Sequence, residues 1–324
     1  MSGATQEDGP GVMTPSREGS PTEQRNPRTA DIDIVPTEEV LRLLNAEDAT
    51  VAAAVANALP VLALVVDKAV ECVRAGGQVH YFGAGTSGRM AVLDAAEVVP
   101  TFGLDHGVFI AHHAGGDRAL GTAMEDAEDD ASLGADAASS VSAADVAVGI
   151  TASGRTPYVA GALAAARQAG AVTVLVSSNP IAPLAGLADY LVVADTGPEA
   201  IAGSTRLKAA TAQKLLLNAL STAAMVRLGR TYSNLMVSLS GTNDKLRGRQ
   251  LTILMEATGA DEPACRAQLA MCGGDLRLAL LCLLSGMDPE AASKALTAAD
   301  GSVRGALAGQ SWPAHPGTAG DPTA

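Results

Sequence analysis

Aromatic residues are scarce in this chain: they make up 2% of its 324 residues, whereas hydrophobic residues make up 48%. Alanine, valine and leucine must therefore supply the core, and such small side chains suit helices packed closely on a parallel sheet. Basic residues are also few, since 22 Lys and Arg face 35 Asp and Glu and the formal net charge is −13. This balance argues against nucleic acid or an anionic membrane as a partner. Any bound phosphate must be held by hydroxyls, backbone amides and helix ends.

The marks of secreted, membrane and metal-binding proteins are missing as well. The first 20 residues are polar, which argues against a signal peptide, and the longest apolar run, residues 58–66, is interrupted by Pro60 and too short to cross a bilayer. No carboxylate or cysteine completes a metal-ligand set around His106, His112 and His113. The cysteines lack paired C-x-x-C spacing, so reduced and mostly buried thiols are expected at Cys72, Cys265, Cys272 and Cys282.

Composition divides the chain into four parts. Residues 1–35 are rich in proline and scattered charge and are expected to be mostly disordered. Residues 36–248 hold three predicted helices, at about 37–44, 48–59 and 61–74, followed by an alternating α/β region. Residues 249–308 are predicted to form a small helical domain, since their short helical patterns are broken by glycines. Residues 309–324 are rich in proline and glycine and are expected to be a disordered tail.

The middle of the chain alternates between apolar runs and helical patterns, as a parallel α/β sheet requires. The apolar runs are nearly continuous, which is typical of strands buried on both faces. Strands are predicted at residues 79–82, 108–111, 146–150, 172–176 and 190–193. Helices are predicted at about residues 90–97, 118–133, 158–169 and 207–228.

A glycine-rich segment, Gly83–Arg89, follows the first predicted strand and precedes a helix. This order makes an anion site, because free N–H groups and the helix dipole favour negative charge at the first helical turn. The spacing also fits G-x-G-x-x-G, but the next strand is followed by His112 and His113 and not by the acidic residue that would hold a dinucleotide ribose. A phosphorylated small molecule is therefore favoured over NAD. The alternative is a tight turn with no ligand.

Two further segments resemble the first, at residues 150–157 and 203–206. All three combine glycine with hydroxyl side chains next to a helix, and the carboxyl ends of parallel strands meet at one edge of the sheet. Together they could surround one phosphate with neutral donors, the alternative being that the hydroxyls only cap helices. The candidate phosphate-binding residues are Thr86, Ser87, Gly88, Ser153, Gly154, Thr156, Ser204 and Thr205.

Acidic residues in two places are candidates for proton transfer. Glu97 is expected near the end of a helix closed by Pro100, where the dipole would favour the protonated form that a general acid needs. The alternative is an exposed helix end. A second group comprises Glu125, Asp126, Glu128, Asp129 and Asp130. Most such runs form a solvated face, and the residues alone do not select one of the five as a base.

These segments, in order and at consistent spacing from residue 22 to residue 307, closely resemble the bacterial N-acetylmuramic acid 6-phosphate etherases. That family belongs to the sugar-isomerase (SIS) fold and is related to the glucokinase regulatory proteins. The matching blocks are Thr22–Asn26, Gly83–Arg89, Leu93–Glu97, Pro100–Gly103, Ala127–Asp129, Ala152–Tyr158, Gly197–Glu199, Gly203–Arg206 and Asn234–Val237.

The resemblance implies a cytoplasmic lyase that cleaves the D-lactyl ether of the sugar phosphate by elimination and hydration, giving N-acetylglucosamine 6-phosphate and D-lactate. By motif match, Glu97 stands at the position of the acid that protonates lactate, and Glu128 at that of the second catalytic glutamate. No metal or other cofactor is implied. The implied architecture is a three-layer α/β/α domain with a five-stranded parallel sheet, N-terminal helices and a small C-terminal helical (UBA-like) domain. A homodimer with its pocket at the subunit interface is also implied.

The chain departs from the family pattern at several positions, among them Ala96, Val98 and Val99, and none of these removes a proposed acid or phosphate ligand. Two rival functions share the same fold. One is a sugar-phosphate sensor without catalysis, which would need neither Glu97 nor Glu128. The other is a sugar-phosphate aldose–ketose isomerase, which would not release lactate.

Overall fold

Five parallel strands form the centre of the computed structural model, which describes residues 20–104, 107–122, 124–239, 241 and 244–309. The strand order is β2-β1-β3-β4-β5, and the neighbouring strands of this sheet are parallel. The predicted five-stranded parallel sheet is confirmed. Its strands are β1 (Val79–Gly83), β2 (Phe109–His113), β3 (Val146–Thr151), β4 (Val172–Ser177) and β5 (Tyr190–Val193).

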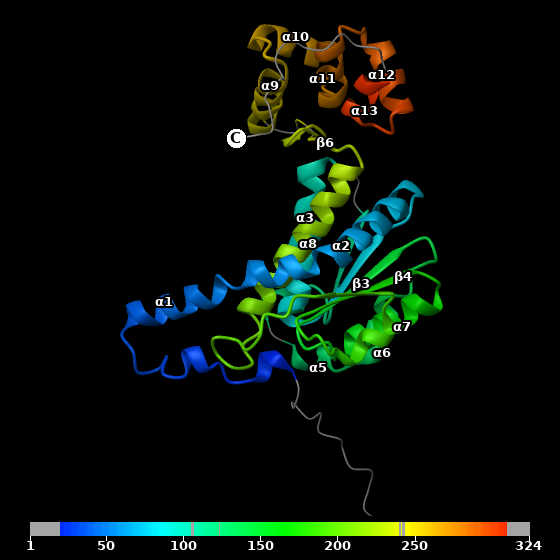
Figure 1. The fold of residues 1–324 in the computed structure, drawn as a ribbon. Helices are drawn as coiled ribbons and strands as arrows, with labels where there is room; N and C mark the ends of the chain where they lie inside the picture. Colours follow the sequence, from blue (N-terminus) through cyan, green and yellow to red (C-terminus); the bar gives the residue numbers. More distant parts are fainter. Residues whose placement is uncertain (1–19, 105–106, 123, 240, 242–243, 310–324) are drawn as a thin grey trace, which may run out of the picture.

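Helices cover both faces of this sheet, which confirms the three-layer architecture (Figure 1). On one face α2 (Val51–Arg74), α3 (Gly85–Phe102) and α8 (Lys208–Arg227) share a core of alanine, valine and leucine with the strands. On the other face α6 (Ala131–Ala137) and α7 (Pro157–Gln168) form a second core. Because aromatic residues are scarce, close packing of small side chains fills both cores.

Two helix predictions were wrong at their boundaries. The helix expected at 118–133 is three short ones, α4 (Arg118–Gly121), α5 (Glu125–Glu128) and α6. A new helix starts because the Asp130 side chain accepts hydrogen bonds from the N–H groups of Ser132 and Leu133 and so caps α6.

The expected break at Pro60 is also wrong, because α2 runs unbroken through it. Proline removes one backbone donor, and the gap in the hydrogen-bond series lies on the exposed side of the helix, at Ala56 and Pro60.

The segment from residue 20 to residue 35, expected to be disordered, is ordered in the structure. It forms two short 3₁₀ helices, Pro21–Glu23 and Pro27–Thr29. Its contacts are with the loop that precedes α8: the Thr22 carbonyl accepts from Gly203 N–H at 3.0 Å, and the Thr29 hydroxyl donates to the Ala200 carbonyl at 2.7 Å. Polar side chains bonded to a distant loop hold this segment, a kind of order that composition does not reveal.

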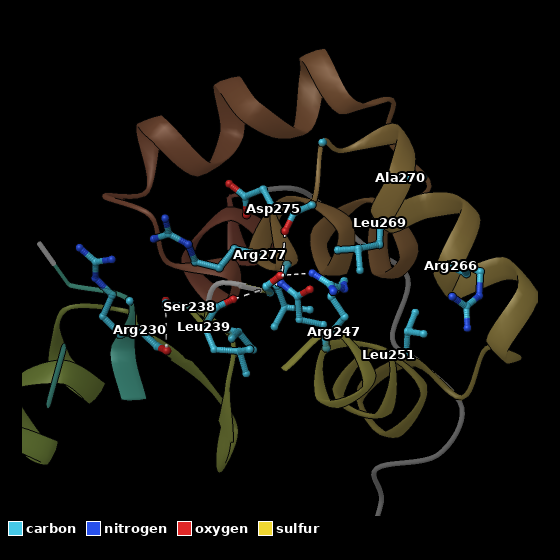
Figure 2. Close-up of a pocket in the computed structure, with 17 residues that line it drawn as sticks. Arg230, Ser238, Leu239, Arg247, Leu251, Arg266, Leu269, Ala270, Asp275 and Arg277 are labelled. Carbon is cyan, nitrogen blue, oxygen red and sulfur yellow. Dashed lines mark hydrogen bonds between the residues drawn. The ribbon is translucent and has the colours of Figure 1, made fainter. Parts of the chain in front are cut away.

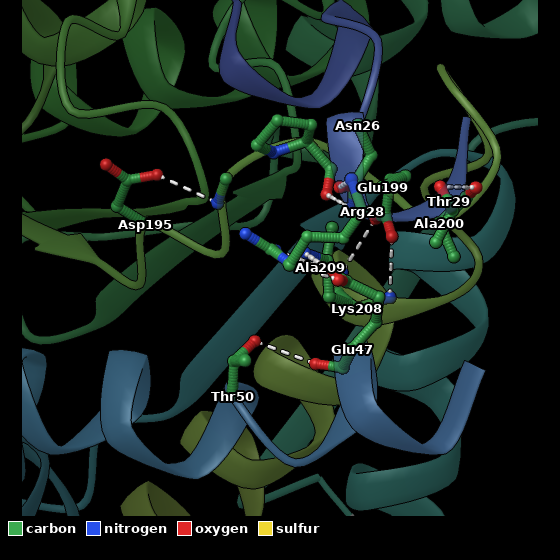
Figure 3. Close-up of polar contacts among 12 residues, drawn as sticks. Asn26, Arg28, Thr29, Glu47, Thr50, Asp195, Glu199, Ala200, Lys208 and Ala209 are labelled. Atoms are coloured by element: carbon green, nitrogen blue, oxygen red, sulfur yellow. Dashed lines mark hydrogen bonds and ion pairs between the residues drawn. The ribbon is translucent and has the colours of Figure 1, made fainter. Parts of the chain in front are cut away.

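A network of buried ion pairs lies beside the segment of residues 20–35 (Figure 3). Lys208, at the start of α8, is fully buried and donates to the Glu47 carboxylate at 2.7 Å. Glu47 lies near the end of α1 (Thr37–Asp48) and also accepts from Arg28 Nη2 at 2.7 Å. Hydrogen bonds from Arg28 and Lys208 outweigh burial and lower the pKa of Glu47 from 4.5 to about 2. The network therefore joins the N-terminal segment, α1 and α8.

The C-terminal part begins with a two-stranded hairpin, β6 (Thr231–Tyr232) and β7 (Leu235–Met236), which was not predicted. Five helices with their own core follow. The first begins at residue 244, five residues before the expected start of the helical domain. These helices are α9 (Asp244–Thr258), α10 (Glu262–Met271), α11 (Leu276–Ser285), α12 (Pro289–Ala298) and α13 (Val303–Ala308). All four cysteines are buried free thiols.

Removing the Glu47 carboxylate should strongly destabilise the fold, because it leaves the Lys208 ammonium buried without a counter-charge. We expect Glu47→Ala to lower the free energy of unfolding by about 3–5 kcal/mol, measured by urea denaturation near pH 7. The native carboxyl has the lower pKa, so its stabilising effect is complete above the unfolded pKa of 4.5 and is lost as the pH falls from 4.5 toward about 2. The difference between the two proteins should shrink over that window.

The matched control is Glu38→Ala on the same helix, where an exposed carboxylate pairs with Arg42 at 2.9 Å. Exposed pairs contribute less than about 1 kcal/mol. Equal losses for Glu47→Ala and Glu38→Ala would contradict the assignment.

Candidate active site

The first glycine-rich loop lies at the carboxyl edge of the sheet, as predicted. In the sheet register Gly83 at the end of β1 is level with Ile150 of β3 and His113 of β2. Gly85 begins α3, and its N-cap residue, Ala84, has no polar side chain to cap the helix. The N–H groups of the first turn, which includes Thr86 and Ser87, are therefore available to an anion.

Gly85 and Gly88 of this loop have different structural roles. Gly85 has a φ of +53° at the turn, a conformation that glycine adopts readily. Gly88 is buried behind the loop, where a Cβ would lie 2.5 Å from both the Gly83 carbonyl oxygen and the His113 ring. Its N–H donates to the Ala84 carbonyl at 3.2 Å. Gly88 therefore permits the close packing of α3 on β1, and its N–H is already engaged within the chain.

The second loop follows β3 and is held by its own hydroxyls. The hydroxyls of Thr151 and Thr156 are 2.8 Å apart, and that of Ser153 lies 3.4 Å from Thr151. Gly154 has a φ of +71°, and a Cβ there would lie 2.4 Å from Cβ of Ala182. Since β1 and β3 are neighbours in the sheet, this loop lies beside the first one.

The third loop, Gly203–Arg206, lies at the same edge. Asp94 of α3 accepts hydrogen bonds from Asn218 and Ser221 of α8. The two helices lie side by side with their C-terminal ends together beside β6 (Figure 1), so they run parallel and begin at the same end. Ser204 and Thr205 are half-buried there.

The N-terminus of α8 is already occupied by a protein carboxylate (Figure 3). Both oxygens of the buried Glu199 accept backbone N–H groups at 2.9 Å, from Lys208 and Ala209. Burial raises the pKa of this carboxyl. The third loop can therefore offer hydroxyls to a ligand, whereas the first turn of α8 does not.

Glu128 joins the first two loops. It is the last residue of α5, and one carboxylate oxygen accepts from the Thr156 hydroxyl at 3.4 Å. The other oxygen lies 3.9 Å from the place that a Cβ on Gly85 would take. Among the side chains of the acidic run that the structure describes, Glu128 is therefore the carboxylate that lies between these two loops. The charge pattern alone could not single out Glu128, because its position depends on where the short helix α5 ends; in the sequence only the motif match did so.

Glu97 lies away from these loops. The helix expected to close at Pro100 continues to Phe102, so Glu97 is not at the helix end. It is exposed and stands 12 residues beyond Gly85, about 18 Å along the helix axis. A single chain therefore does not bring Glu97 and Glu128 into one pocket.

Three residues that support this edge were not among the predicted site residues. Arg89 donates to the carbonyls of Ala119 and Leu120 at 2.9 Å, which fixes the chain that leads to Glu128. The carboxylate of Glu23 lies over Gly203, with one oxygen 3.1 Å from the place of a Cβ there. Asp94 is buried by its contacts with α8, and burial raises its pKa. The motif around Glu23 was visible in the sequence, but its contact with the third loop was not.

Histidines form a stack beside the site. The rings of His112 and Phe82 are 4.5 Å apart, and His80 Nδ1 lies 3.0 Å from His112 Nε2. Burial, and secondly His80, lowers the pKa of His112 to about 4, so both rings can pack without charge. Within the described ranges, no group of three or more His, Cys, Asp or Glu side chains could hold a metal ion.

Comparison with known proteins identifies the family. The chain is 60% identical over 266 residues to the N-acetylmuramic acid 6-phosphate etherase of Thermobifida fusca (strain YX), covering 82% of this chain and 88% of the relative. It is 48% identical over 288 residues to the etherase of the same name from Brucella anthropi, covering 88% and 94%. This chain belongs to the N-acetylmuramic acid 6-phosphate etherase family. It is therefore an enzyme that cleaves a carbon–oxygen ether bond.

Two domain families also match parts of this chain. Residues 61–167 match the glucokinase regulatory protein N-terminal SIS domain, and residues 119–223 match the SIS domain. Among solved structures, a phosphoheptose isomerase from Francisella tularensis is similar, with a TM-score of 0.48 and 18% identity over 59% of this chain and all of that one.

If the loop hydroxyls hold the substrate phosphate, their loss should weaken binding more than turnover. Ser87→Ala and Ser153→Ala should each remove one charge-assisted hydrogen bond, of about 1.5–3 kcal/mol, and raise KM about 10- to 100-fold with a smaller change in kcat. Steady-state kinetics with N-acetylmuramic acid 6-phosphate measures this. Ser293→Ala on the exposed surface of α12 is the control. Unchanged KM in both loop variants would show that these hydroxyls do not hold the phosphate.

Proposed function

We propose that this chain cleaves the D-lactyl ether at C3 of N-acetylmuramic acid 6-phosphate, yielding N-acetylglucosamine 6-phosphate and D-lactate for the recycling of cell-wall sugars. The observation that carries the proposal is the position of Glu128, whose carboxylate lies between the first and second hydroxyl loops. The loops are suited to a phosphate monoester, and the carboxylate beside them is suited to proton transfer. Membership of the etherase family supports the substrate.

The proposed reaction is an elimination followed by a hydration on the ring-opened sugar. The C1 aldehyde acidifies the C2 proton, which Glu128 accepts as general base. The electron pair forms a C2–C3 double bond, and the C3–O bond breaks as lactate leaves with a proton from Glu97. Water then adds at C3, and C2 regains a proton. Two carboxyl groups suffice for these proton transfers, and no redox step occurs.

A sensor function is the second candidate, favoured by the match of residues 61–167 to the regulatory-protein domain. Such a protein needs the phosphate loops but no acid or base. Incubation of the purified protein with N-acetylmuramic acid 6-phosphate and an enzymatic assay for free D-lactate distinguishes the functions. We expect one lactate per sugar consumed. Binding without lactate would favour the sensor, and conversion of the sugar without lactate would favour an isomerase.

The two glutamates should differ in which half-reaction they support. We expect Glu128→Gln to lose both ether cleavage and exchange of the C2 hydrogen with solvent. Glu97→Gln should lose cleavage while keeping C2 exchange, because exchange needs the base but not protonation of lactate. Each change should lower kcat by about 10²–10⁴.

NMR of substrate in D₂O with each variant measures C2 exchange, and a lactate assay measures cleavage. Asp126→Asn, which changes an exposed member of the same acidic run, is the control and should stay active. Normal lactate release by Glu97→Gln would remove Glu97 from the mechanism. C2 exchange by Glu128→Gln but not by Glu97→Gln would reverse the two roles.

We propose that Glu97 acts in the site of a second copy of the chain. Within one chain the helix axis separates it from the loops by about 18 Å, whereas a two-fold interface brings a residue of each subunit to the other reciprocally. A pair of sites, each with Glu128 from one subunit and Glu97 from the other, satisfies both the mechanism and the geometry. The proposed active species is a homodimer.

The surface of α2 supports this assembly. No charged residue occurs between Asp48 and Asp67, and by length and composition the helical stretch Thr37–Arg74 is apolar enough to cross a membrane. Only 33% of its most apolar 18-residue window is buried within the chain. Apolar faces this large fit a protein interface. The exposed apolar residues of α2 are Ala52, Ala53, Ala56, Leu59, Pro60, Ala63 and Leu64.

Charges placed on this face should separate the subunits. We expect Leu59→Asp/Leu64→Asp to have the mass of a monomer by light scattering at micromolar concentration and to lose lactate release at least about 100-fold, because Glu97 would then be missing from each site. The control is Ile181→Asp, which alters an apolar side chain that is 71% exposed on another surface. A wild-type monomer with full activity would contradict the shared site.

We further propose that the enzyme acts in the cytoplasm. The four buried thiols suit a reducing compartment, where cysteines remain free.

A further inference from the structure

A second cavity lies far from the proposed catalytic edge. It has a volume of about 770 Å³, within the range of about 300–1,000 Å³ that small-molecule sites occupy. The segment Val237–Leu239 and helices α9, α10 and α11 form its walls. Gly103, just beyond the end of α3, also lines it, whereas the catalytic loops lie at the start of α3. The two places are therefore separated by the length of that helix, about 27 Å.

The charge of this cavity is opposite to that of the chain. Four arginines and one carboxylate line it, although the whole chain carries a formal net charge of −13. Figure 2 shows Arg230 and Arg277 on one side of the cavity and Arg266 on the other, with Arg247 between them. A cluster of guanidinium groups at a concave surface attracts anions, and each can bind two oxygens of a phosphate.

The carboxylates that pair with Arg247 and Arg266 are exposed and do not line the cavity. Arg247 pairs with Asp244, whose side chain is fully exposed, and Arg266 pairs with Glu262 on the surface. The single lining carboxylate, Asp275, accepts from the Leu278 N–H and so caps α11. Exposed pairs are weak, so a ligand can replace them.

Arg277 differs from Arg247 and Arg266. It is half-buried and, within the described part of the chain, is in no ion pair. Its Nη1 lies 2.9 Å from the place that a Cβ on Gly301 would take. Its own position is the second residue of α11, where the helix dipole adds to the positive potential.

The cavity is also held in shape without a ligand. Gln250 of α9 is 2% exposed, and its amide donates to the carbonyls of Leu239 at 3.2 Å and Gly274 at 3.3 Å. One side chain thereby ties two walls together. Leu251 and Leu269 give the cavity an apolar part, which suits the carbon skeleton of an organic phosphate.

We propose that this arginine-lined cavity is a second anion site, which binds a small phosphorylated molecule independently of the catalytic loops. Arg247 and Arg277 hold the phosphate, and Gln250 keeps the walls in place. The site does not depend on the proposed etherase reaction, since none of its residues belongs to the catalytic edge.

Calorimetric titration with inorganic pyrophosphate tests the site in the full-length protein at low salt. We expect binding that weakens at least about tenfold in Arg247→Gln/Arg277→Gln, because two charge-assisted contacts are lost. Ser87→Ala/Ser153→Ala should keep this binding, which separates it from any pyrophosphate at the catalytic loops. Arg277→Lys should give an intermediate loss of affinity, since lysine keeps the charge but cannot donate two parallel hydrogen bonds to the phosphate.

The matched control is Lys245→Gln/Arg249→Gln, which removes the same two charges from exposed positions of α9 that do not line the cavity. Its affinity for pyrophosphate should equal that of the wild type. The proposal is wrong if the wild type shows no binding at millimolar pyrophosphate, if the control loses as much affinity as the cavity variant, or if only the Ser87→Ala/Ser153→Ala protein loses it. Unchanged melting temperatures verify that the variants are folded.

Discussion

The parallel register of β1 with its two neighbours is the constraint on which the site depends. It brings the carboxyl ends of three strands to one edge, with Gly83, Ile150 and His113 side by side. The close approach of Gly88 to Gly83 then sets α3 directly against β1. With the strands and helix fixed in this way, the first and second loops meet, and Glu128 reaches both of them. A side chain at Gly88 would separate α3 from the sheet and open the site.

A second constraint acts at the third loop. Glu199 takes the N–H groups at the start of α8, and Glu47 neutralises the buried Lys208 beside it. The same network retains the N-terminal segment, which lays Glu23 over Gly203. Burying these charges is costly unless each is paired. The loop is therefore held from two sides by groups that lie far from it in the sequence.

Sequence predicted those parts of the fold that depend on local pattern. The five strands follow from continuous apolar runs, and the glycine loop follows from its spacing before a helix. Three features could not be read in this way. The order of residues 20–35 depends on hydrogen bonds to residues about 170 positions away. The charge pattern did not single out Glu128, which only the family motif did, because its position depends on the cap at Asp130. The distance of Glu97 from the first loop depends on a helix that already starts at Gly85.

The central claim is that each site combines Glu128 of one subunit with Glu97 of its partner. Release of D-lactate by dimers co-expressed from Glu97→Gln and Glu128→Gln chains tests it most directly. Each variant alone should be nearly inactive. Random pairing makes about half of the dimers mixed, and each mixed dimer has one intact site, so about a quarter of wild-type activity should return. Mixed dimers that form but remain as inactive as the single variants would show that both glutamates act within one chain.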